Sequence, residues 1–161
     1  MPVSAGLPRR HPVPSFTRRR VLVTAAAVVG ASPVLAACSP GTRQEADATE
    51  ALLALADAAR MDAALAVAAV TGDPALAGRL EPLRAARMDH AAALDQAGGR
   101  APGSVPAPAT PPSADLAAVR DSVAASARTA GEIVPRASAL QVGLVAEVAA
   151  CCAAYAGVLA Q

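Results

Sequence analysis

A run of 15 residues, 98–112, carries five prolines and separates two pairs of helical patterns. Proline fixes its φ angle and lacks a backbone N–H, so the run should be extended rather than helical. At about 3.1 Å per residue it can reach about 45 Å, whereas a helix of about 24 residues is about 36 Å long. The run can therefore cover the whole length of a helical bundle. We expect it to start the third helix at the opposite end from the one where the second helix finishes.

Apolar residues recur at helical spacing in four stretches, and no stretch shows the alternation typical of a β-strand. The stretches cover residues 44–71, 73–97, 113–135 and 138–161. Only a few residues join the members of each pair, which predicts two antiparallel helical hairpins. We therefore predict one all-α domain over 44–161, a four-helix bundle whose hairpins are joined by the crossover at 98–112. A long crossover between two hairpins is the ferritin-like topology.

Two short motifs predict where helices begin. Asp73 and Pro74 follow Gly72, which is typical of an N-cap residue and a proline at the first helical position. Ser138 and Gln141 are three residues apart, the spacing of a capping box at the start of the fourth helix.

The first 37 residues have the pattern of an export signal. Arg18 and Arg19 stand directly before an apolar, alanine-rich run at 21–37, as in a charged region before the apolar part of a signal peptide. The segment resembles a twin-arginine signal, and Leu35-Ala36-Ala37-Cys38 resembles a lipobox. The resemblance implies cleavage before Cys38, lipid attachment to this cysteine, and a short tether at 38–43.

Two alternatives to this interpretation stay open. Val21 stands where the twin-arginine motif usually has phenylalanine, which leaves general secretion as a second route. The run at 21–37 is also near the lower length limit of a transmembrane helix. Gly30 and Pro33 interrupt the run, which favours a cleaved signal over a permanent span.

Charge is distributed unevenly along the chain. None of the 13 acidic residues precedes Glu45, whereas five of the 14 arginines lie in the first 20 residues. Residues 38–161 carry nine arginines against 13 acidic residues, a net charge of −4. Nucleic-acid binding requires clustered positive charge. We therefore expect no nucleic-acid partner.

Two cysteines, Cys151 and Cys152, remain once Cys38 is assigned to lipid. Adjacent residues of a helix point about 100° apart, so a disulfide between them would be strained. They are either small core residues, or thiols that form an intermolecular disulfide or a redox pair outside the cytoplasm.

The second helical pattern resembles the small ferritin-like domains of exported actinobacterial proteins. The resemblance lies in residues 73–84 and 89–94, with a similar alanine-rich pattern at 144–159. Ferritin-like metalloproteins hold two metal ions through Glu-x-x-His pairs and further glutamates. Here Arg87 stands three residues before His90, and Ala150 stands three residues after Glu147. We therefore expect no metal, no cofactor and no catalysis.

Arg87 and His90 continue a leucine seam at helical spacing, which places both toward the bundle interior. A hairpin turning at residues 72–73 sets residues opposite when their numbers sum to about 146. This predicts Asp57 near His90 and Asp62 near Arg84, with either aspartate able to approach Arg87. These five residues are the candidate polar seam. Either Arg87 extends to solvent beside a core histidine, or the seam forms a polar pocket for a small anionic ligand.

Three functions are compatible with these patterns. We favour an extracytoplasmic module anchored to the cell membrane through lipid on Cys38, which binds or scaffolds an envelope protein. The alternatives are a degenerate ferritin-like metal-binding or oxidase domain, and a carrier of a small apolar molecule between the helices.

Overall fold

The computed structural model describes residues 40–105 and 107–161. The predicted signal at 1–37, with Arg18 and Arg19, and the lipid site Cys38 lie outside these residues. The prediction of an all-helical bundle is confirmed. The described residues form four α-helices and two short 3₁₀ helices, with no strand among them. The elements are α1 (Pro40–Gly72), η1 (Pro74–Leu76), α2 (Ala77–Ala97), α3 (Leu116–Ile133), η2 (Val134–Arg136) and α4 (Val142–Leu159).

Helix α1 begins four residues before the predicted start at Gln44. Residues 40–43, which the sequence assigned to a tether, form its first turn instead. The helix leaves two residues, Cys38 and Ser39, of the expected tether before Pro40.

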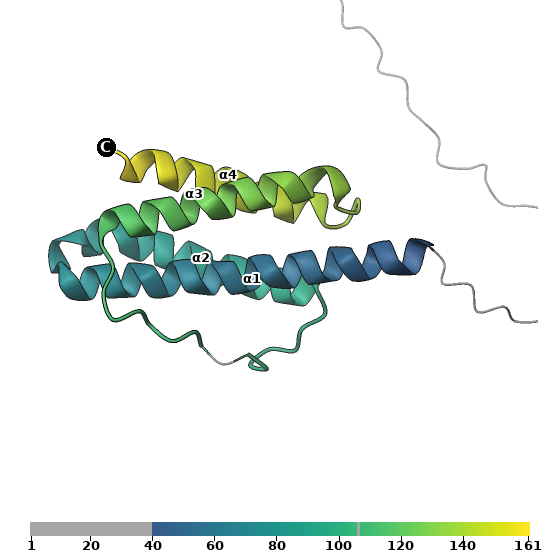
Figure 1. The fold of residues 1–161 in the computed structure, drawn as a ribbon, viewed down its shortest axis with the longest axis horizontal. Helices are drawn as coiled ribbons and strands as arrows, with labels where there is room; N and C mark the ends of the chain where they lie inside the picture. Colours follow the sequence, from purple (N-terminus) through teal and green to yellow (C-terminus); the bar gives the residue numbers. More distant parts are fainter. Residues whose placement is uncertain (1–39, 106) are drawn as a thin grey trace, which may run out of the picture. The chain divides into compact units, whose positions relative to one another are not determined.

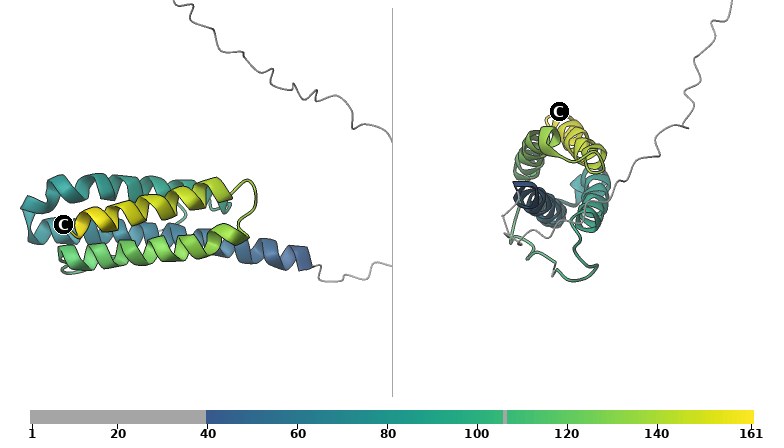
Figure 2. Two further views of the ribbon diagram at one scale, coloured as in Figure 1. Left: turned by 90° about the horizontal axis from the view of Figure 1, so that it is seen from above. Right: turned by 90° about the vertical axis from the view of Figure 1, so that its right-hand side faces the viewer.

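The connector between α2 and α3 runs along the bundle, as Figure 1 shows, so that α3 starts where α1 ends. A Cβ built on Gly72 would lie 4.0 Å from the carbonyl oxygen of Ala114, just before α3. Helices α1 and α3 are therefore antiparallel neighbours. Arg79, near the start of α2, donates to the carbonyl of Val158 near the end of α4 at 3.3 Å, so α2 and α4 are also antiparallel. Figure 2 shows the four helices around a common axis.

Side-chain caps fix the starts of the second and third helical segments. Asp73 accepts a hydrogen bond from the backbone N of Ala75 at 3.0 Å, and Asp115 accepts one from Ala118 at 2.7 Å. Each satisfies a backbone N–H that has no partner within the helix. Before α4, the Gln141 side chain accepts from the hydroxyl and the backbone N of Ser138, at 3.0 and 3.4 Å.

Helix α2 ends in a Schellman motif. Gly99 has φ +73°, which glycine adopts without the penalty that a Cβ brings. The N–H of Arg100 donates to the carbonyl of Asp95 at 2.8 Å, and that of Gly99 to Gln96 at 3.2 Å. The motif turns the chain sharply and places Arg100 back beside the end of α2.

All four helices contribute to one apolar core. Its largest members are leucines and valines of which at most 1% is exposed: Leu52, Leu55, Leu80, Leu83, Leu94, Val119, Val123, Val145 and Val148. Helix α4 has a mean hydropathy of 1.9 and is long enough to cross a membrane by length and composition, and 22% of it is buried. Its buried residues belong to the shared core, so in this structure α4 is a helix of the bundle.

Candidate functional site: a buried ion pair between the helices

Arg87 and Asp62 form an ion pair in the bundle interior. The Arg87 side chain is 0% exposed and that of Asp62 is 1% exposed. Nε of Arg87 donates to Oδ2 of Asp62 at 3.0 Å, and Nη2 lies 2.9 Å from the same oxygen. Of the two interpretations of Arg87, extension to solvent is therefore wrong. The chain stabilises the buried guanidinium with a carboxylate from the neighbouring helix.

Two serines of α3 complete the surroundings of the Asp62 carboxylate. Ser126 donates to Oδ2 at 2.8 Å, and Ser122 donates to Oδ1 at 2.5 Å. The carboxylate thus receives hydrogen bonds from α2 and from α3. Because both oxygens are occupied, the carboxylate is held in one orientation and its charge is shared among donors rather than left exposed to the apolar core.

His90 lies one turn after Arg87 and is 7% exposed. Its Nδ1 is 3.2 Å from Nη1 of Arg87. A guanidinium has donors only, so Nδ1 must accept and the ring proton resides on Nε2. Burial lowers the pKa of His90, and the positive charge of Arg87 lowers it further. The negative charges of Glu147 and Asp89 act in the opposite direction. The geometry requires a neutral histidine.

The two cysteines of helix α4 lie near enough to this site for the charge of Arg87 to act on their pKa values. Both are free thiols, and Cys152 is buried whereas Cys151 is half-buried. Burial raises the pKa of Cys152 to about 11, and it also raises the pKa of Cys151. A thiolate is the reactive form of cysteine. Cys152, which belongs to the shared core, is therefore a packing residue at neutral pH. For the half-buried Cys151 both interpretations from the sequence stay predictions.

Asp57 and Arg84, the other members of the predicted seam, lie elsewhere. The Asp57 side chain is 52% exposed and pairs with Arg60 at 2.9 Å and with Arg100 at 2.5 Å. Arg84 pairs with Glu81 on the exposed side of α2 at 2.5 Å. The expected contacts of Asp57 with His90 and of Asp62 with Arg84 are both wrong. Only Asp62, Arg87 and His90 come together.

The hairpin register explains this difference. The numbers of the paired residues Asp62 and Arg87 sum to 149 rather than 146. The turn is built by Asp73 and η1, so its midpoint lies between Pro74 and Ala75 rather than at Gly72–Asp73. The shift brings Arg87, one turn beyond Arg84, opposite Asp62.

A second charged cluster, which the sequence did not predict, joins α1, α2 and the connector. Arg60 pairs with Asp95 as well as with Asp57, and Arg100 bonds Asp57 and, at 3.2 Å, Asp95. The hydrogen bond from Arg100 lowers the pKa of Asp57. The sequence feature that could have indicated this cluster is the double glycine at 98–99. It forms the Schellman turn, which directs the Arg100 side chain back toward α1. Two arginines and two aspartates neutralise one another here.

The chemistry of the buried site follows from its donors. No group of three or more His, Cys, Asp or Glu side chains capable of holding a metal is found within residues 40–105 and 107–161. The guanidinium of Arg87 occupies the interior, where it would repel a cation. Its Nη2, although 2.9 Å from Oδ2 of Asp62, is not aligned for a hydrogen bond, and it is the only buried side-chain nitrogen or oxygen without a hydrogen-bond partner in the described part of the chain. The site has the features of a structural ion pair.

Comparison with protein-family models, with curated proteins and with solved structures finds no significant match to this chain.

Proposed function

We propose that this chain is a membrane-anchored, extracytoplasmic lipoprotein. Its helical domain has ferritin-like topology and acts as a non-catalytic binding or scaffolding module at the membrane surface. The partner that fits this placement is another envelope protein.

The Asp62–Arg87 ion pair is the observation that carries the non-catalytic part of the proposal. It lies where helices α1, α2 and α3 meet, with Nε 3.0 Å from Oδ2 and both side chains buried. Ferritin-like metalloproteins use the interior of the bundle for carboxylate and histidine ligands. In this chain the interior carboxylate is bound by an arginine and two serines, and the nearby histidine accepts from the same arginine. These contacts stabilise the bundle and occupy both oxygens of the Asp62 carboxylate and Nδ1 of His90.

The ferritin-like topology is supported by the path of the connector. Two hairpins with a crossover along the bundle (Figure 1) make α1 and α3 antiparallel, as the arrangement requires. An up-down-up-down bundle would instead make α2 and α3 antiparallel neighbours joined by a short loop.

The anchored location is supported by the sequence before α1. Cys38 follows Leu35-Ala36-Ala37 and stands two residues before Pro40, where α1 begins. Lipid on Cys38 would hold the start of α1 at the membrane surface. Nothing longer than two residues would separate lipid and helix, so the module would act on partners in or next to the membrane.

Replacement of the lipid site tests the location. Metabolic labelling with an alkyne fatty acid, followed by fractionation of envelopes, should show acylated wild-type protein in the membrane fraction. Cys38→Ala should lose label and membrane association, whereas Cys151→Ala should keep both. Wild-type protein that carries no acyl label would refute the anchored location.

Metal analysis tests the non-catalytic bundle. Protein purified without chelators should contain no stoichiometric iron, manganese or zinc. A bound metal that is lost on replacement of Asp62 or His90 would favour the degenerate metal-binding domain instead.

A further inference from the structure

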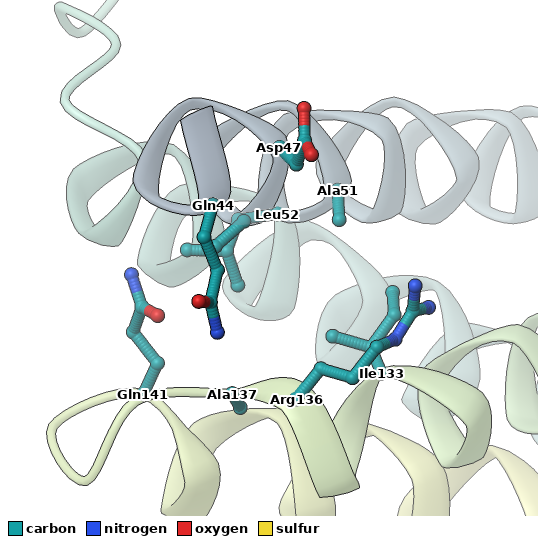
Figure 3. Close-up of a pocket in the computed structure, with 9 residues that line it drawn as sticks. Gln44, Asp47, Ala51, Leu52, Ile133, Arg136, Ala137 and Gln141 are labelled. Atoms are coloured by element: carbon teal, nitrogen blue, oxygen red, sulfur yellow. The ribbon is translucent and has the colours of Figure 1, made fainter. Parts of the chain in front are cut away.

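A pocket of about 290 Å³ lies between the first half of α1 and the turn from α3 to α4 (Figure 3). We call it the α1–η2 pocket. Its apolar wall consists of Ala48, Ala51, Leu52, Ile133 and Ala137. Leu52 and Ile133 are 1% and 8% exposed and belong to the shared core. The pocket is therefore a concavity that continues into the apolar interior.

The rim of the α1–η2 pocket is polar. Gln44, Gln141 and Arg136 extend into the space between α1 and η2, whereas the carboxylate of Asp47 points away from η2 (Figure 3). Nε of Arg136 donates to the backbone carbonyl of Glu132 at 3.3 Å. Arg136 forms no ion pair with any side chain in the described part of the chain. A guanidinium with free donors at the edge of an apolar pocket matches a carboxylate or phosphate group attached to an apolar chain.

The pocket opens toward the start of α1. A neighbouring depression of about 500 Å³ shares Gln44, Arg136 and Gln141 with it and extends to Gly41, the second residue of α1. Gly41 follows Cys38 by three positions, a reach of at most about 11 Å. If lipid is attached to Cys38, the opening is held next to the membrane surface.

We propose that the α1–η2 pocket binds one acyl chain of an anionic single-chain amphiphile taken from the membrane, with its carboxylate or phosphate group on Arg136. The volume of about 290 Å³ is just below the range of ligand pockets, about 300–1,000 Å³, so we assign the pocket one acyl chain rather than the two of a diacyl lipid. The membrane as the source rests on the anchored location proposed above. The binding itself depends only on the pocket.

Photo-crosslinking with a diazirine fatty acid tests the pocket. The full chain, purified and placed in phosphatidylcholine nanodiscs, should be labelled on peptides from 44–52 and 133–141. Ala48→Phe should fill the pocket and reduce labelling at least tenfold, whereas Ala54→Phe, on an exposed position of the same helix, should not. For the purified chain in buffer without nanodiscs, competing saturated fatty acids should gain about fourfold in potency per added methylene until the pocket is full, because each methylene then leaves water.

The role of Arg136 is tested with two head groups. Arg136→Gln should weaken labelling by the fatty acid about two- to fivefold, the range of an exposed charge pair. It should leave labelling by the matching diazirine fatty alcohol unchanged, and Arg128→Gln, on an exposed position of α3, should change neither. A lysolipid phosphate used as competitor distinguishes the two anionic groups. If the site prefers phosphate, this competitor should displace the probe better than a fatty acid of the same chain length does. Equal loss with fatty acid and alcohol would refute the assignment of the head group to Arg136.

The two proposals fail separately. A chain acylated on Cys38 that is labelled equally in Ala48→Phe and Ala54→Phe would overturn the pocket and leave the anchor standing. A chain labelled as expected but not acylated would overturn the anchor alone.

Discussion

Arg87 on α2 and Asp62 on α1 meet in the bundle interior with Nε 3.0 Å from Oδ2, and neither side chain is more than 1% exposed. Burial of either charge alone would cost several kcal/mol. Each side chain stays ionised in the interior because the other supplies the opposite charge. The pair also defines the register of the first hairpin, because a shift by one helical turn would place Arg84 or another residue opposite Asp62. We expect stability to respond very differently to changes in one partner and in both.

Asp62→Asn should destabilise the domain by about 3–5 kcal/mol, because it leaves the Arg87 guanidinium buried without a counter-charge. The measurement is the free energy of unfolding from urea titration monitored by circular dichroism. Asp57→Asn is the matched control, because Asp57 is 52% exposed and its loss should cost less than about 1 kcal/mol. The double variant Asp62→Leu/Arg87→Met should recover most of the loss. A single variant as stable as wild type would show that the ion pair does not hold the register.

His90 should make stability depend on pH. Burial and the charge of Arg87 lower its pKa in the folded chain, so below about pH 6.5 the unfolded chain binds a proton that the folded chain does not. This contribution to stability is fully present above pH 6.5 and is lost as pH falls through the folded pKa. Its slope should not exceed about 1.4 kcal/mol per pH unit.

His90→Gln is the control for this pH dependence, because an amide oxygen can still accept from Arg87 and does not titrate. Carboxylates contribute acid sensitivity of their own in both proteins. The difference between wild type and variant, measured by urea titration at several pH values from neutral to mildly acidic, isolates the histidine. Parallel stability curves for the two proteins would mean that His90 does not titrate differently on folding.

Much of the fold could be predicted from the sequence, because it depends on local signals. Helical periodicity identified four helices, and the same periodicity placed Arg87 and His90 inside the bundle. The sequence did not decide which of the two aspartates, Asp57 or Asp62, pairs with Arg87. The choice depends on the hairpin register, which is set by the three residues of η1 in the turn. Ser122 and Ser126 were missed altogether. Their contact with Asp62 is set by the long crossover between α2 and α3, which carries no local signal of register.

The α1–η2 pocket was also beyond prediction from sequence. It requires the start of α1 to lie against the turn between α3 and α4, and these segments are about 90 residues apart. The sequence did suggest an apolar cargo from a core rich in alanine. The structure locates the concavity at one end of the bundle rather than along its axis.

Two glycines should respond with opposite signs to the same substitution. Gly99 has φ +73° in the Schellman turn, so Gly99→Ala should destabilise by about 1–2 kcal/mol through the left-handed conformation. Gly131 lies inside α3, and a Cβ there would meet nothing within 4 Å. Gly131→Ala should stabilise by about 0.5–1 kcal/mol through helix propensity. Both values come from thermal or urea unfolding, and a gain in stability for Gly99→Ala would contradict the turn geometry.

The two cysteines should differ in their reaction with a thiol reagent. The pKa of Cys152 is raised to about 11 by burial, so at neutral pH very little of it is thiolate, and the side chain is closed to reagents in the folded chain. Cys151 is half-buried and should react first, although more slowly than a free thiol because its pKa is also raised. The Cys38→Ala protein, in which only these two thiols remain, should therefore show one slow phase with 5,5′-dithiobis-(2-nitrobenzoate), and a second thiol should appear only in denaturant. Cys151→Ser should remove the native phase and Cys152→Ser should leave it. A non-reducing gel that shows a dimer lost in Cys151→Ser would instead favour an intermolecular disulfide through the half-exposed thiol.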